Sequence, residues 1–160
     1  MTSARHLLLL LASLGLSGDD IARSADGKLV VGLLPVDVEA EFDGCGCFFG
    51  AGAEENTYRH YLTGWNLDEE DRTPLRINGR TERLSAEIVE APGEPASRIG
   101  DPVLFQLRNP QVRVDLVCKI AENCEASQDE NCESTSYACN ATIEAHGSHV
   151  ELPANGRCGC

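Results

Sequence analysis

Eight cysteines are the feature that most limits how this chain of 160 residues can fold. An even number of cysteines in an exported chain of this size indicates a disulfide framework, and eight cysteines allow 105 pairings. Their spacing alone does not choose among these pairings, so the strand pattern around them has to be used. The cysteines are Cys45, Cys47, Cys118, Cys124, Cys132, Cys139, Cys158 and Cys160.

The first residues are typical of a leader peptide that directs export. Arg5 and His6 precede a leucine-rich run over residues 7–16, which has the length of a signal-peptide core and is too short to span a membrane. The small residues in Ala22-Arg23-Ser24 predict cleavage after residue 24. We therefore expect a leader over 1–24 and a single domain over 25–160, with a periplasmic or secreted location. No second apolar stretch reaches the length of a membrane span.

Two segments in the second half of the chain alternate apolar and polar residues with a period of two, which is the signature of half-buried strands. They cover residues 112–120 and 136–145. If the two strands pair antiparallel with Cys118 opposite Cys139, every inward residue meets another inward residue. A slip by one position would turn one apolar set outward. The other predicted pairs are Val112 with Ala145, Val114 with Ile143, Leu116 with Ala141 and Ile120 with Tyr137.

This hairpin predicts two disulfides, Cys118–Cys139 and, nested inside it, Cys124–Cys132. The remaining cysteines form two Cys-Gly-Cys units, at 45–47 and 158–160. A bridge within such a unit closes a strained ring, so we expect the two units to be cross-linked to each other. The pattern leaves the pairing between the units open.

The rest of the chain reads as short strands separated by glycine, proline and asparagine turns. Asn78-Gly79 is typical of a type I′ turn and predicts a hairpin over 75–84, whose second strand continues through Ala86 and Ile88. Further strands are predicted at 29–34, 36–43, 103–107 and 150–152, whereas 58–65 fits either a strand or a short helix. We therefore expect an all-β fold, a single antiparallel β-barrel or β-sandwich stapled by disulfides.

The formal net charge of −13 opposes binding to nucleic acid and to anionic membranes and favours cationic partners, metal cations or simple solubility. An acidic stripe, formed by Asp37, Glu39, Glu41 and Asp43, is predicted on the outer face of the strand at 36–43. Carboxylates two residues apart on a strand lie about 7 Å from each other, so a solvated face is favoured over a calcium site.

A second function class follows from the cysteines themselves. The two Cys-Gly-Cys units, Cys45 with Cys47 and Cys158 with Cys160, offer four thiolates for zinc or copper, with His146 and His149 as further ligands, or for thiol–disulfide exchange. An oxidising compartment favours disulfides over this alternative. Neither Gly-x-Ser-x-Gly nor His-Glu-x-x-His occurs, so we predict no enzymatic activity and no cofactor.

The chain resembles a loosely defined group of small exported bacterial cysteine-rich proteins of unknown function. The shared features are Cys45-Gly46-Cys47, Ile77-Asn78-Gly79-Arg80, the strand at 112–117 and the final Gly159-Cys160. It is also similar in kind to periplasmic lysozyme inhibitors, small disulfide-containing β-barrels, whose partner is a strongly cationic enzyme. The first resemblance implies the fold and no known activity. Our leading expectation is a non-enzymatic domain that binds a partner or ligand through its surface loops.

Overall fold

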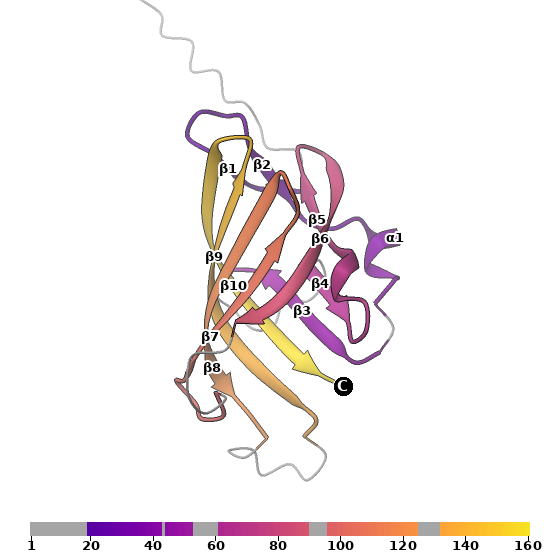
Figure 1. The fold of residues 1–160 in the computed structure, drawn as a ribbon, viewed down its shortest axis with the longest axis vertical. Coiled ribbons are helices and arrows are strands. Elements are labelled where there is room, and N and C mark those ends of the chain that lie inside the picture. Colours follow the sequence, from indigo (N-terminus) through magenta and orange to yellow (C-terminus); the bar gives the residue numbers. More distant parts are fainter. Residues whose placement is uncertain (1–18, 43, 53–60, 90–95, 125–131) are drawn as a thin grey trace, which may run out of the picture.

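The structure, a computed structural model, describes residues 19–42, 44–52, 61–89, 96–124 and 132–160. Within these residues there are ten strands, one short helix and one 3-10 turn (Figure 1). The bounds are β1 (Asp20–Arg23), β2 (Val30–Gly32), α1 (Val36–Glu39), β3 (Gly46–Ala51), β4 (Tyr61–Asn66), η1 (Glu70–Arg72), β5 (Thr73–Ile77), β6 (Arg80–Val89), β7 (Pro102–Arg108), β8 (Val112–Glu122), β9 (Ser134–Ala145) and β10 (Ser148–Gly159).

Eight of the strands close into an antiparallel barrel, which resolves the choice between barrel and sandwich. The order around the ring is β5-β4-β3-β10-β9-β8-β7-β6, and pairing of β5 with β6 completes it. The β1–β2 hairpin adds to the sheet through β2, which pairs antiparallel with β5 and places Val31 opposite Ile77. Closure removes free strand edges, which otherwise invite pairing with other chains.

The predicted hairpin of β8 and β9 is confirmed in every expected pair. Cys118 lies opposite Cys139, and the four other predicted pairs have the same partners in the structure. Along β8, buried and exposed residues alternate from Val112 to Ile120. The hydrophobic pattern therefore fixed the register, because any shift by one residue would expose the apolar face.

The hairpin of β5 and β6 is also confirmed. Asn78 and Gly79 have φ angles of 49° and 75°, as a type I′ turn requires, and β6 runs on through Ala86 and Ile88. The strand predicted at 103–107 is β7, and the ambiguous segment around 58–65 contains strand β4 in its described part.

The barrel interior is filled by side chains, as expected for eight strands. Aromatic rings occupy its centre: Phe49 stacks on Trp65 at 5.7 Å between ring centroids, and Phe105 lies edge-on to Phe49 at 5.1 Å and to Tyr137 at 5.2 Å. Phe49 and Phe105 are fully buried. This packed core holds the strands that carry the turns at either end.

The prediction of a strand at 36–43 is wrong. Residues 36–39 form helix α1, with the Pro35 carbonyl accepting hydrogen bonds from the amides of Val38 and Glu39 at 2.9 and 3.0 Å. The proline ring fixes a φ angle that suits the start of a helix. Val38 is buried and Phe42, four residues on, packs against Phe48, whereas Val36 is 69% exposed. The apolar residues thus also fit a helix, and Pro35 decides between the two periods.

The last strand is longer than the predicted 150–152, because β10 extends to Gly159. Pro153, Gly156 and Gly159 lower its intrinsic strand propensity. Gly156 is explained by packing, since a Cβ atom there would lie 2.2 Å from a ring carbon of Phe49. The core therefore needs the glycine that weakens the strand signal.

Part of the predicted leader lies inside the fold. Residues 1–18 are outside the described residues, whereas 19–24 are described and contain β1. Within the described part of the chain, no helix is long and apolar enough to cross a membrane.

Candidate functional site

The two Cys-Gly-Cys units are joined by two parallel disulfides, Cys45–Cys160 and Cys47–Cys158, which we call the clasp. The antiparallel register of β3 and β10 places Cys47 opposite Cys158 and Gly46 opposite Gly159. This register decides the pairing that the sequence left open. The clasp closes loops of 115 and 111 residues and ties the end of the chain to the first strand of the barrel proper.

The other four cysteines form Cys118–Cys139 and Cys124–Cys132, the same pairs that the hairpin pattern predicts. All eight cysteines are therefore disulfide-bonded, so none presents a thiolate in this state. Four disulfides indicate an oxidising compartment outside the cytoplasm.

The six residues proposed as metal ligands do not form one site, because the four cysteines are joined in the clasp and the two histidines lie far from it. His146 and His149 lie at the β9–β10 turn, whereas Cys158 and the rest of the clasp lie at the other end of β10, about 30 Å along the strand at the usual rise per residue. Among the described residues, no group of three or more His, Cys, Asp or Glu side chains is placed to hold a metal ion.

The acidic stripe is not a continuous surface. The Glu39 carboxylate accepts a hydrogen bond from the Tyr61 amide at 2.7 Å, and Glu41 forms an ion pair with Arg83 at 3.0 Å. Asp37 lies in the first turn of α1, where a negative charge is favourable, and Asp43 is outside the described residues. Helix geometry directs these carboxylates to different neighbours.

One end of the barrel carries the β5–β6, β7–β8 and β9–β10 turns together with the β1–β2 loop, at the top of Figure 1. An open groove of about 670 Å³ lies there between two of these turns, and we call it the turn-end groove. It is lined by residues 106–113 of the β7–β8 hairpin and 144–149 of the β9–β10 hairpin. His146 and His149, which the sequence offered as further metal ligands, both line it.

The walls of the turn-end groove are held by local hydrogen bonds. The Asn109 side-chain oxygen accepts from the amides of Gln111 and Val112, each at 2.8 Å, which fixes the β7–β8 turn. At the facing turn, His146 and Gly147 have φ angles of 54° and 77°, the conformation of a tight hairpin turn. Both walls are therefore formed before any partner binds.

The two arginines that line the turn-end groove are each paired with a carboxylate. The Arg108 guanidinium lies 2.8 Å from the Glu87 carboxylate, and Arg113 lies 2.7 Å from Asp115. The hydrogen bond to Asp115, together with its negative charge, raises the pKa of Arg113. These pairs neutralise the positive charge of the groove, and the Glu144 carboxylate also lines it.

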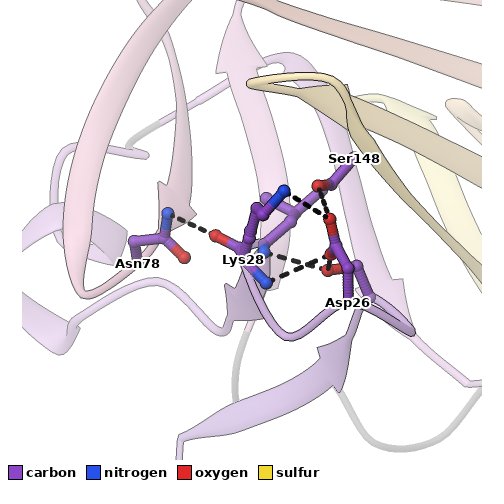
Figure 2. Close-up of polar contacts among 6 residues, drawn as sticks. Asp26, Lys28, Asn78 and Ser148 are labelled. Carbon is purple, nitrogen blue, oxygen red and sulfur yellow. Dashed lines mark hydrogen bonds and ion pairs between the residues drawn. The ribbon is translucent and has the colours of Figure 1, made fainter.

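A second polar cluster, which the sequence did not reveal, centres on Asp26 in the β1–β2 loop (Figure 2). Its carboxylate accepts hydrogen bonds from the Ser24 hydroxyl at 2.6 Å, the Ser148 hydroxyl at 2.7 Å and the Lys28 amide at 3.2 Å. These hydrogen bonds, that of Ser24 first, lower the pKa of Asp26. Because Ser148 is 122 residues away, no local sequence pattern could have indicated the contact.

The Asp26 cluster adjoins a second hollow of about 590 Å³, lined by residues 22–26 and 147–151. The two hollows share Gly147, Ser148 and His149, so the β9–β10 turn stands between them.

Comparison with protein-family models, with curated proteins and with solved structures finds no match to this chain.

Proposed function

We propose that this protein is an exported, non-enzymatic binding domain that engages a partner through the turn-end groove. The observation that carries the proposal is the preformed groove itself, walled by two hydrogen-bonded turns on a closed barrel. Rigid strands that present shaped turns are a common arrangement for recognition, because little order has to be gained on binding.

Export is supported by the disulfides and by the leucine-rich start of the chain. Two disulfides that each span more than a hundred residues would not persist in a reducing cytoplasm. Together with the signal-like sequence of residues 1–16, they favour a periplasmic or secreted location.

A cationic protein is the partner class that the charge favours. The net charge of −13 raises the local concentration of a positively charged partner and speeds its association. Since both arginines of the groove are paired with carboxylates, they do not repel such a partner. The groove then contributes shape and hydrogen bonding, and the acidic surface as a whole contributes electrostatic steering.

The proposal assigns no catalytic role to the cysteines. All eight cysteines are in disulfides, so no thiol nucleophile is present.

Binding and inhibition of a strongly cationic lysozyme test the proposal. We expect a dissociation constant at or below about micromolar, which rises steeply with salt because steering is screened. His149→Trp fills the groove and should weaken binding about tenfold or more, a loss of about 1.4 kcal/mol. Asn140→Trp is the matched control, since Asn140 is an exposed neutral residue on β9 outside the groove.

Two results would contradict the proposal. If the lysozyme does not bind at micromolar protein, a strongly cationic enzyme is excluded as the partner. If both tryptophan variants lose the same affinity, the binding surface lies elsewhere on the barrel.

A further inference from the structure

Residues 19–24, which the sequence assigned to the leader, are built into the sheet. Asp20 pairs with Gly32, Ala22 with Val31 and Arg23 with Val30, and the Asp19 carbonyl accepts a hydrogen bond from the Leu33 amide at 2.9 Å. The backbone of β1 therefore covers the outer edge of β2.

The side chains of this segment make contacts with distant parts of the domain. Ile21 and Ala22 pack against the hydrophobic core. The Asp19 carboxylate lies 3.2 Å from the Arg76 guanidinium of β5. Contacts of this range are a property of the folded domain, whereas a leader has to be removable without loss of the fold.

Ser24 is the strongest case, because it is only 7% exposed. Its hydroxyl accepts a hydrogen bond from the buried Leu29 amide at 3.0 Å and donates one to Asp26 at 2.6 Å. Cleavage after Ser24 would leave a buried amide without its acceptor and would remove one of the serines that hold Asp26. It would also expose the edge of β2.

We propose that the leader is cleaved between Ser17 and Gly18, so that the mature chain keeps β1 and starts at Gly18. Small residues occupy the last and third-last positions of the leader in Gly15-Leu16-Ser17, as an export peptidase of the signal-peptide type requires. This bond lies directly after the apolar run and leaves Asp19 and the whole of β1 in place. The inference rests on the export that we propose above.

N-terminal sequencing and intact mass of the chain, expressed from Met1 in a bacterial host and recovered outside the cytoplasm, test the site. The expected product starts at Gly18 and has the mass of residues 18–160 with four disulfides. A product that starts at Asp20 or later, including Ala25, would overturn the site and leave export intact. An unprocessed chain that stays in the cytoplasm would overturn export and, with it, the site.

Two variants locate the cleavage independently of protein yield. Ser17→Leu places a large side chain before the proposed bond and should lower the rate of processing about tenfold or more in a pulse–chase measurement. Ser24→Thr is the control, because threonine keeps the hydroxyl that bonds Leu29 and Asp26. Normal processing of Ser17→Leu, or slowed processing of Ser24→Thr, would contradict the proposed site.

Discussion

The Asp26 carboxylate joins the β1–β2 loop to the first residue of β10, Ser148, across 122 residues of sequence. It accepts two hydroxyl hydrogen bonds and one amide hydrogen bond, and Lys28 adds an ion pair at 3.5 Å. The Asn78 side chain bonds Lys28 and Val30 in turn, so the β5–β6 turn is drawn into the same cluster (Figure 2). Asp26 thus connects the β1–β2 loop to the β9–β10 turn, and Asn78 connects the same loop to the β5–β6 turn.

The pKa of Asp26 predicts how stability depends on pH. Because hydrogen bonds lower this pKa in the folded state, the unfolded chain takes up the proton first as the pH falls. The contribution of Asp26 to the free energy of unfolding is therefore complete above its ordinary pKa of about 3.9 and is lost as the pH falls further. Urea unfolding, followed by the fluorescence of Trp65, measures it.

In that measurement Asp26→Asn should be less stable than the natural protein at neutral pH, and the difference should shrink below about pH 4. Asn140→Ser, which exchanges one neutral side chain for another at an exposed position of β9, is the control and should keep a constant difference over the same pH range. A difference for Asp26→Asn that stays constant down to acidic pH would contradict the assigned role of the carboxylate.

Among the elements, β8 shows most clearly how the barrel separates its two faces. Leu116 is fully buried and points into the core, whereas its neighbour Val117 is 59% exposed. Leu116→Ala should lower the free energy of unfolding by about 2–5 kcal/mol, because it leaves a cavity in a packed core. Val117→Ala should change it by less than about 0.5 kcal/mol.

The two changes remove apolar carbon from adjacent positions of one strand, so chemical denaturation of both variants compares the faces directly. Similar losses from the two would show that the barrel interior is not where the alternation of β8 places it.

Whether a strand was predicted correctly from the sequence depended on how many residues share one period. In β8 and β9, five inward pairs had to agree, and only one register satisfies them. In 36–43 the alternation was as strict, yet it extended over eight residues and began after Pro35, so a helix satisfied it too. Short apolar alternation without a partner strand does not decide between the two periods.

The candidate site was harder to predict than the strands. The sequence offered His146 and His149 as further metal ligands, but the turn-end groove that they line arises from the adjacency of two hairpins around the ring. The Asp26 cluster depends on a contact between the two ends of the chain. Both are consequences of closure, which no local pattern encodes.

For the whole molecule, the clasp closes a chain whose first and last barrel segments lie side by side. Cys45–Cys160 and Cys47–Cys158 close almost the same loop, so their effects on the unfolded chain overlap. Once one disulfide restricts the unfolded chain, the second adds only a small loop between the two Cys-Gly-Cys units. The two disulfides should therefore stabilise the fold in a strongly non-additive way.

Removing one disulfide of the clasp at a time, and then both, tests this expectation. With Cys45 and Cys160 changed to serine, or Cys47 and Cys158 changed to alanine, loop entropy predicts a loss of about 2 kcal/mol each, whereas loss of both should cost about 7 kcal/mol. Intact mass confirms which disulfides remain, and urea unfolding gives the free energies. A double loss equal to the sum of the two single losses would mean that the disulfides act through local packing, because redundancy in closing one loop requires the double loss to exceed that sum.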